Sequence, residues 1–151
     1  MRHPAITFTL LLLILSSCHL GGGKSSDYPA LLPMPEEVVW QDGGVVPLTK
    51  GHTIVLPSAD ERYRILVEGL NADLSKAGLP TLELTPEYTY GSVICTIDDK
   101  ELTTPGAYTL SVKRGGIRIT AADEDGIGYA LQTLRQLILP SGIPTVEIKD
   151  K

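Results

Sequence analysis

The stretch ITAADEDGIGYALQTLRQL, residues 119–137, decides the fold because it joins a strand pattern directly to a helix pattern. Residues 117–121 alternate apolar and polar side chains, as a strand with one buried face does. Over residues 124–139 the apolar side chains instead recur at helical spacing. Gly126-x-Gly128 lies at the junction. A dinucleotide-binding loop begins with the same order of a strand, Gly-x-Gly and a helix. The apolar stripe of the helix comprises Ile127, Ala130, Leu131, Leu134, Leu137 and Ile138.

The junction does not have the chemistry of a phosphate-binding loop. Leu131 stands where the third glycine of the motif would allow close packing of helix and strand. Asp123, Glu124 and Asp125 crowd the start of the helix, where a pyrophosphate would meet like charge. We therefore interpret these acids as an N-cap cluster on a tight strand-to-helix turn.

A second helix pattern begins at Ser58, which has the spacing of a capping box with Glu61. Gly78 and Pro80 are typical of the end of a helix. Its apolar stripe comprises Tyr63, Leu66, Val67, Leu70, Leu74 and Ala77.

The other apolar segments predict short strands. Residues 38–41 and 45–48 flank Asp42-Gly43-Gly44 and are predicted to form a hairpin. Residues 107–113 and 117–121 flank Arg114-Gly115-Gly116 and are predicted to form another. Further strands are predicted at residues 53–56, 82–84, 92–97 and 143–148. These elements predict an α+β fold, a mostly antiparallel sheet with two helices packed on one face.

The first residues indicate export. Residues 5–15 form an apolar run that follows a short basic start and is shorter than the roughly 20 residues needed to span a bilayer. Leu15-Ser16-Ser17-Cys18 resembles a bacterial lipobox; the alternative is an ordinary signal peptide with an unrelated cysteine. We expect a signal peptide at residues 1–17, lipid attachment at Cys18, a flexible tether at residues 18–27 and a folded domain at residues 28–151. The expected location is the bacterial cell envelope, with the chain anchored to the membrane through the lipid.

Several kinds of chemistry are not indicated. The 13 basic and 18 acidic residues give a net charge of −5 without a basic patch, which argues against nucleic-acid binding. No metal site is expected, because zinc-ligand spacing is absent and the glycine of Asp123-x-Asp125-Gly126 comes too early for a calcium loop. No cofactor is expected either. No pair of carboxylates is marked as lying across a glycosidic bond, and Cys95 lies in an apolar run typical of a buried side chain.

The polar side of the 124–139 helix carries Tyr129, Gln132, Thr133 and Gln136. A tyrosine among amides, with little charge, is the kind of surface that protein interfaces favour. The alternative is an ordinary solvent face with one exposed aromatic residue. We treat these four residues as a candidate domain interface.

The block GAYTLSVKRGGIRITAADEDGIGYALQTLRQLI, residues 106–138, resembles the N-terminal domain of bacterial β-N-acetylhexosaminidases of glycoside hydrolase family twenty. In that domain a strand pair Tyr-x-Leu-x-Val…Gly-Ile-x-Ile-x-Ala leads into a helix Gly-x-x-Tyr-x-x-Gln-Thr-Leu-x-Gln-Leu. Residues 32–35 and 143–150 are similar to the opening and the closing strand of the domain, so the likeness covers residues 28–151. The matching residues of the block are Tyr108, Leu110, Val112, Gly116, Ile117, Ile119, Ala121, Gly126, Tyr129, Gln132, Thr133, Leu134, Gln136 and Leu137.

The resemblance implies a non-catalytic domain whose two helices pack against a following (β/α)₈ barrel. In the family that barrel carries the catalytic Asp-Glu pair, and the whole enzyme releases terminal N-acetylglucosamine or N-acetylgalactosamine from glycans. Such a barrel takes about 250 residues, and the sequence ends at Lys151. We therefore expect no catalytic residue in this chain and no hydrolysis by it alone.

Two functions from different classes remain open. The first is the accessory or scaffolding domain of a lipid-anchored β-N-acetylhexosaminidase, present here as a fragment, with the barrel as its partner in cis if the gene continues. The second is a stand-alone lipoprotein that binds glycans or a partner protein. A third option is the leading domain of another enzyme that releases hexosamines or uronates.

Overall fold

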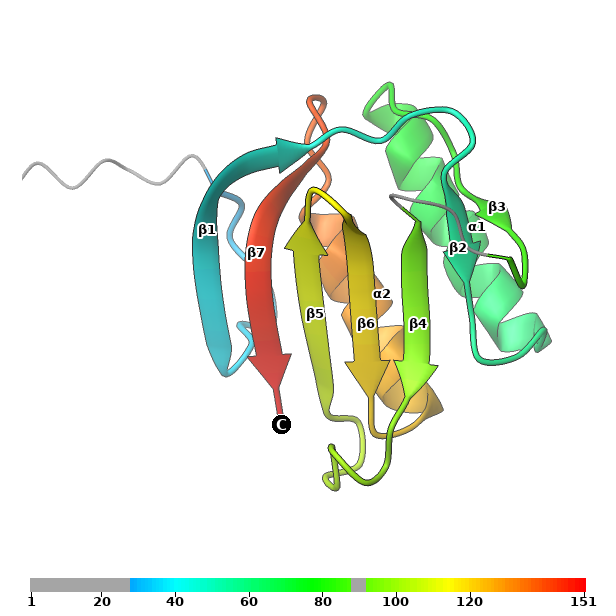
Figure 1. Ribbon diagram of the computed structural model, residues 1–151, viewed down its shortest axis with the longest axis vertical. Helices are drawn as coiled ribbons and strands as arrows, with labels where there is room; N and C mark the ends of the chain where they lie inside the picture. The colour runs from blue at the N-terminus through cyan, green and yellow to red at the C-terminus, as the bar shows by residue number, and fades with distance from the viewer. Residues whose placement is uncertain (1–27, 88–91) are drawn as a thin grey trace, which may run out of the picture.

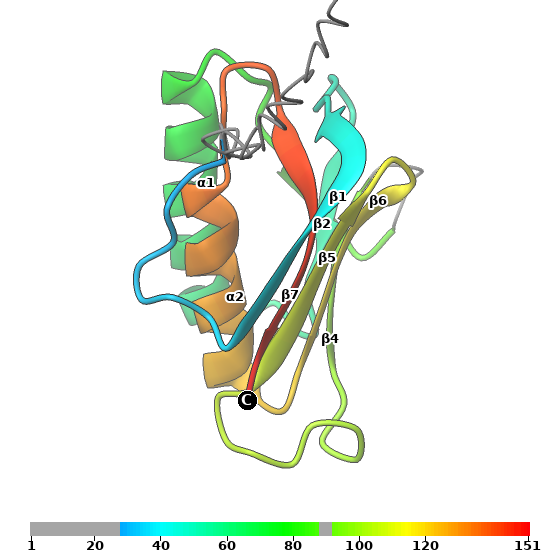
Figure 2. The same ribbon diagram turned by 90° about the vertical axis from the view of Figure 1, so that its left-hand side faces the viewer.

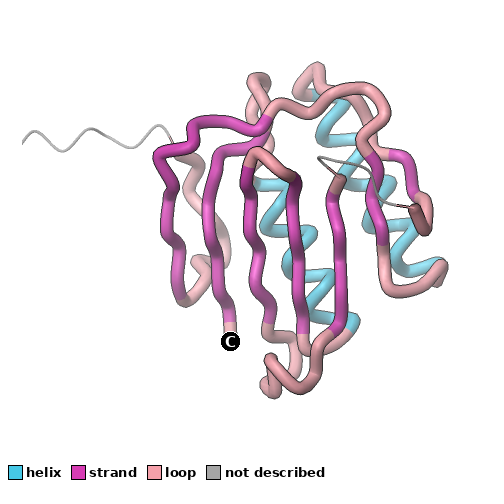
Figure 3. Tube along the Cα trace, viewed as in Figure 1, coloured by secondary structure: helices cyan, strands magenta, loops and turns pink. Residues whose placement is uncertain are grey.

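The computed structural model describes residues 28–87 and 92–151, which form one seven-stranded sheet and two helices (Figures 1 and 3). The strand order is β1-β7-β5-β6-β4-β2-β3. The elements are β1 (Glu37–Val46), β2 (Thr53–Val55), α1 (Glu61–Lys76), β3 (Glu83–Leu84), β4 (Val93–Ile97), β5 (Tyr108–Lys113), β6 (Gly116–Ala121), α2 (Glu124–Gln136) and β7 (Ile143–Asp150).

Antiparallel pairing dominates one half of the sheet and parallel pairing the other. β1–β7, β7–β5 and β5–β6 are antiparallel, and the predicted hairpin around residues 114–115 is confirmed. β6–β4, β4–β2 and β2–β3 are parallel. α1 joins β2 to its neighbour β3 and is the crossover that this parallel pair requires. Since β2 pairs over only two residues on each side, most of the paired length is antiparallel.

Both helices lie on the same face of the sheet, as the sequence predicts (Figure 2). The core lies between the two layers, where the alternating residues of β5 and β6 meet the apolar stripes of the helices. Each of these aliphatic side chains contributes about 1.5–3 kcal/mol to folding when it is fully buried. The fully buried aliphatic residues of these elements include Leu70, Leu74, Leu110, Ile117, Ile119, Ile127, Leu131 and Leu134.

The opposite face of the sheet carries charged side chains. Lys113 lies 2.7 Å from Glu147, and Lys149 lies 3.7 Å from Glu37 across neighbouring strands. Arg118 is exposed on β6. This face is therefore wet, which is what the alternation in residues 107–121 predicts. Within the described parts of the chain, neither helix has the length and apolarity to cross a membrane.

The start of α1 and the end of α2 differ from the predictions, whereas the stop at Gly78 and the start at Glu124 agree with them. α1 begins at Glu61, with Asp60 as its N-cap: the Asp60 carboxylate accepts a hydrogen bond from the Arg62 amide at 2.8 Å. The predicted start at Ser58 is wrong because the aspartate supplies a cap two residues later. α2 ends at Gln136 and not at residue 139, since residues 139 and 142 instead exchange backbone hydrogen bonds in the turn before β7.

The predicted hairpin of residues 38–48 is also wrong. Residues 37–46 form one continuous strand, β1, which pairs with β7 and contains a bulge between Trp40 and Val45. The hydroxyl of Thr145 on β7 holds the bulge by donating to the carbonyl oxygens of Gln41 and Gly44, at 3.0 and 3.2 Å. The glycines that look like a turn in the sequence therefore accommodate a kink within a strand.

Candidate functional site

The outer side of the helix layer carries exposed apolar surface. Tyr129 on α2 is 57% exposed, and Ile65 on α1 is 60% exposed. Gln132, one turn after Tyr129, is also exposed. Large apolar side chains on a protein surface are informative when they cluster near one another. The two predicted interface residues Tyr129 and Gln132 therefore lie on a face that is open in this structure.

Ionic contacts fix the two helices side by side at both ends. Arg62 of α1 binds Glu124 and, at 3.2 Å, Asp125 at the start of α2. Near the other end Arg135 of α2 donates from Nε to Asp73 of α1 at 2.6 Å. The first residues of one helix thus meet the first residues of the other, so the helices run parallel.

The pKa of the Asp73 carboxyl reflects the second of these contacts. The hydrogen bond from Arg135, followed by the one from Lys76, lowers the pKa of Asp73 below its ordinary value. The Asp73 side chain is 25% exposed and that of Arg135 30%, so this pair is better shielded than the Arg62 contacts. The pair holds the outer surface of the helix layer in one arrangement.

Thr133, the third predicted interface residue, is not on this surface. It is 6% exposed, and its hydroxyl forms a hydrogen bond of 2.7 Å with the hydroxyl of Tyr108 on β5. The prediction treated threonine as a polar surface residue, whereas a buried hydroxyl partner allows it to face the core. Thr133 therefore bonds α2 to the sheet within this domain.

Gln136, the fourth predicted interface residue, holds the segment that leads into β1. Its side-chain amide accepts from the Leu32 backbone amide at 2.8 Å and donates to the Leu32 carbonyl at 2.9 Å. We call residues 28–36 the lead-in; this segment lies beside α2 on the helix side of the sheet (Figure 2). Leu32 and Met34 of the lead-in are 77% and 79% exposed. The exposed apolar surface therefore extends from α2 onto the lead-in.

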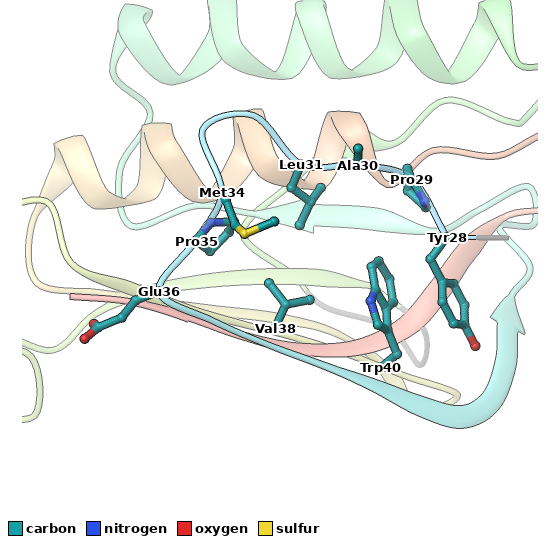
Figure 4. A pocket seen from close by; sticks show the side chains of 9 residues that line it. All are labelled: Tyr28, Pro29, Ala30, Leu31, Met34, Pro35, Glu36, Val38 and Trp40. Carbon is teal, nitrogen blue, oxygen red and sulfur yellow. The ribbon is translucent and has the colours of Figure 1, made fainter. Parts of the chain in front are cut away.

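A cavity of about 440 Å³ lies between the lead-in and β1 (Figure 4). Tyr28 stacks on Trp40 at one end, with ring centroids 4.2 Å apart and planes 5° from parallel. Val38 and Met34 line its middle, and the Glu36 side chain points away from it (Figure 4). Sequence reasoning missed this cavity, because the lead-in has no periodic pattern that would place it over β1.

Asp123 caps α2, as predicted, whereas Gly126 and Gly128 lie inside the helix and not in the turn before it. The Asp123 carboxylate accepts from the backbone amides of Gly126 at 2.8 Å and Gly106 at 2.9 Å. These two hydrogen bonds, that of Gly126 first, lower the pKa of Asp123. The helix N-terminus is therefore already occupied by a carboxylate of its own chain.

No group of three or more metal-ligating side chains occurs in residues 28–87 and 92–151. Cys95 on β4 is 2% exposed, and burial raises the pKa of its thiol to about 12. A buried thiol with a raised pKa is a packing group and not a nucleophile. The prediction that Cys95 is buried is confirmed.

The sequence of residues 28–151 matches the family described as "Glycosyl hydrolase family 20, domain 2". The chain belongs to the domain 2 family of glycosyl hydrolase family 20. The sheet with two helices on one face is the architecture that the sequence resemblance implies, and the resemblance itself is confirmed.

Solved structures with the same fold are longer enzymes. A β-N-acetylhexosaminidase from Bacteroides fragilis NCTC 9343 is 25% identical, with a TM-score of 0.61 over 78% of this chain and 23% of that one. A chitobiase from Flavobacterium johnsoniae is 28% identical, with a TM-score of 0.54 over 80% of this chain and 20% of that one. The β-N-acetylhexosaminidase from Streptomyces coelicolor is 23% identical and shows the fold, with a TM-score of 0.60 over 81% and 27% of the two chains. A comparison with curated proteins gives no match.

This chain thus spans about a quarter of the length of the solved relatives that it matches. Domain 2 is the part that they share. Of the predicted interface residues, Tyr129 and Gln132 lie on the outer helix surface, Gln136 lies at its border, and Thr133 lies beneath it. The predicted lipid attachment site, Cys18, lies outside the described residues.

Proposed function

We propose that this domain 2 is the non-catalytic accessory domain of a lipid-anchored β-N-acetylhexosaminidase, and that its outer helix surface supports a catalytic domain. One observation carries the proposal: the exposed apolar residues on the helix side, Ile65, Tyr129, Leu32 and Met34, are between 57% and 79% exposed. In a family where the matched part is only 23% and 20% of two solved members, a partner domain is the natural cover for such a surface.

The charges of the domain support a non-catalytic role. A glycosidase acid needs a carboxyl whose pKa is raised, so that it stays protonated until it donates to the leaving group. Within the described residues, the carboxyls of Asp73 and Asp123 have pKa values that are lowered and not raised. Both therefore serve as acceptors of structural hydrogen bonds.

The DNA after the codon for Lys151 tests the supporting role. We expect it to encode a catalytic glycoside hydrolase domain, in the same frame or in an adjacent one. The purified chain should leave 4-nitrophenyl N-acetyl-β-glucosaminide intact. Absence of such a coding sequence in every frame, or hydrolysis by this chain alone, would contradict the proposal.

Self-association provides a second test. A surface that normally meets another domain should make the isolated chain associate with itself, and Tyr129→Glu should reduce that association in gel filtration. Thr96→Glu, on the exposed opposite face of the sheet, is the matched control and should have no effect. A wild-type chain that is already monomeric at high concentration would remove this support.

The lipid anchor is a separate part of the proposal and rests on the sequence Leu15-Ser16-Ser17-Cys18. Cells that express the chain should incorporate labelled palmitate into it, and Cys18→Ser should abolish the label. If the wild-type chain incorporates no labelled palmitate, the lipid anchor is wrong, and the rest of the proposal is unaffected.

A second candidate function is glycan binding by a stand-alone lipoprotein. The cavity beneath the lead-in favours it, because the stacked rings of Tyr28 and Trp40 line one end of the cavity, and sugar rings pack on aromatic side chains. Trp40 is the single tryptophan of the chain, so its fluorescence reports on this cavity. If N-acetylglucosamine and its dimer leave the fluorescence unchanged up to millimolar concentration, this candidate fails.

A further inference from the structure

The two glycines of Gly126-x-Gly128 differ in what surrounds them. A Cβ on Gly126 would lie 2.6 Å from the carbonyl oxygen of Ala107 and 2.9 Å from the Cβ of Ala121. Packing inside the domain therefore requires Gly126. A Cβ on Gly128 would meet only the Leu66 side chain, at an ordinary 3.8 Å. Since glycine inside a helix costs about 1 kcal/mol relative to alanine, the packing of this domain gives no reason for Gly128.

Gly128 instead opens a groove on the outer surface. A cavity of about 210 Å³ lies between the N-terminal halves of α1 and α2. We call its uncharged lining residues, Leu66, Gly128, Tyr129 and Gln132, the floor, and its charged lining residues, Arg62, Glu124 and Asp125, the rim. A side chain at position 128 would fill this space, whereas glycine leaves it open to a group from outside. The other helical glycine facing α2, Gly69, has its space taken by the Arg135 guanidinium, 3.2 Å from a built Cβ.

The rim of the groove selects the charge of that group. Glu124 and Asp125 share one cation, Arg62, so the rim carries a net negative charge. The Glu124 and Asp125 side chains are 51% and 67% exposed. A purely apolar guest would cover the one negative charge that Arg62 leaves uncompensated, which costs free energy. A guest with an apolar stem and a positive end would match both the floor and the rim.

We propose that the groove receives a lysine or arginine side chain of the catalytic domain that this domain supports. The stem of that side chain would lie over Leu66 and Gly128, and its charged end would reach Glu124 and Asp125. The ring of Tyr129, which also lines the groove, would add a favourable surface for the cation. The inference rests on the proposed function, because that function supplies the partner, but the preference for a cation belongs to this chain alone.

Titration with a small probe tests the preference. The core of the domain lies within the described residues, so the purified chain with Cys18→Ser can be observed by amide NMR in low salt. N-acetyl-arginine amide should shift the amide signals of Gly128, Tyr129 and Gln132. N-acetyl-citrulline amide has the same shape without the charge. It should bind about two- to fivefold more weakly, the range expected for losing an exposed ion pair.

Gly128→Leu places a side chain of the protein itself in the groove. It should abolish the arginine-induced shifts while the rest of the spectrum and the thermal midpoint show a folded domain. Glu124→Gln combined with Asp125→Asn should make the two probes equivalent. Equal binding of both probes to the wild type, or an undiminished response in Gly128→Leu, would overturn the inference.

The two proposals can fail separately. If the groove selects arginine but no catalytic domain is encoded after Lys151, the proposed function is wrong and the cation-binding groove remains. If a catalytic domain is encoded but the probes bind equally, this inference alone is wrong.

Discussion

Replacing Gly126 by alanine should destabilise the domain, whereas the same replacement at Gly128 should stabilise it. Both positions lie in α2, two residues apart, so the gain in helix propensity is the same, up to about 1 kcal/mol. The difference lies in the space that the new methyl group meets.

At position 126 the methyl group would lie 2.6 Å from the Ala107 carbonyl oxygen and 3.2 Å from the Gly106 carbonyl carbon. Both are backbone atoms, so α2 must move away from the sheet. Overpacking of this kind costs about 1–3 kcal/mol, and a contact as short as 2.6 Å with backbone belongs to the upper part of that range, so the net loss after the propensity gain is up to about 2 kcal/mol. At position 128 the contact is 3.8 Å, and nothing opposes the gain.

Urea unfolding of the two variants and the wild type, followed by far-ultraviolet circular dichroism, measures the difference. The midpoint should fall for Gly126→Ala and rise for Gly128→Ala, with similar slopes. If both variants move the midpoint in the same direction by similar amounts, the argument from close packing is refuted.

Three other predictions use the same measurement or proteolysis. Tyr63→Phe should leave the free energy of unfolding unchanged or raise it by up to about 1 kcal/mol, because the buried Tyr63 hydroxyl has no hydrogen-bond partner among the described residues. Tyr108→Phe removes a hydroxyl that is hydrogen-bonded to Thr133 and should lower it by about 1 kcal/mol, so equal effects of the two substitutions would contradict this reasoning. The lowered pKa of Asp73 contributes stability that is present above the ordinary value of 3.8 and is lost as the pH falls through the lowered pKa. Asp73→Asn should therefore have a lower free energy of unfolding than the wild type at neutral pH, and this difference should shrink as the pH falls through the lowered pKa of Asp73. A difference that stays the same at every pH would count against the contact with Arg135 as its cause. Gln136→Ala should make the lead-in more sensitive to limited proteolysis, with Gln132→Ala as the control, and identical cleavage rates would refute the role of its two hydrogen bonds to Leu32.

The parts of the fold that depend on nearby residues could be predicted from the sequence. The hairpin at residues 114–115, the stripe of α2 and the cap at Asp123 each follow from a pattern within a few positions. The bulge in β1 could not be predicted, because what distinguishes it from a turn is Thr145, about a hundred positions away. The neighbouring residues alone predict that Gly43 and Gly44 lie in a turn.

The candidate site shows the same division. Tyr129 and Gln132 are exposed, as their place opposite the apolar stripe predicts. Thr133 is buried because a partner for its hydroxyl comes from β5, and Gln136 is engaged because the lead-in returns to α2. Both depend on contacts between distant segments, and a helical wheel contains no information about them.

The position of β7 governs when this domain can become complete during synthesis. β7 is the last strand along the chain, yet it lies between β1 and β5, and β1 has no other strand neighbour in the described part of the sheet. A nascent chain therefore exposes an unpaired β1 until residues 143–150 leave the ribosome, so the sheet closes only when the domain is almost wholly made. A polypeptide joined after β7 would then be attached to a strand that is hydrogen-bonded to β1 on one side and to β5 on the other. A force that pulls this polypeptide along the direction of β7 would therefore act in shear on both rows of hydrogen bonds at once.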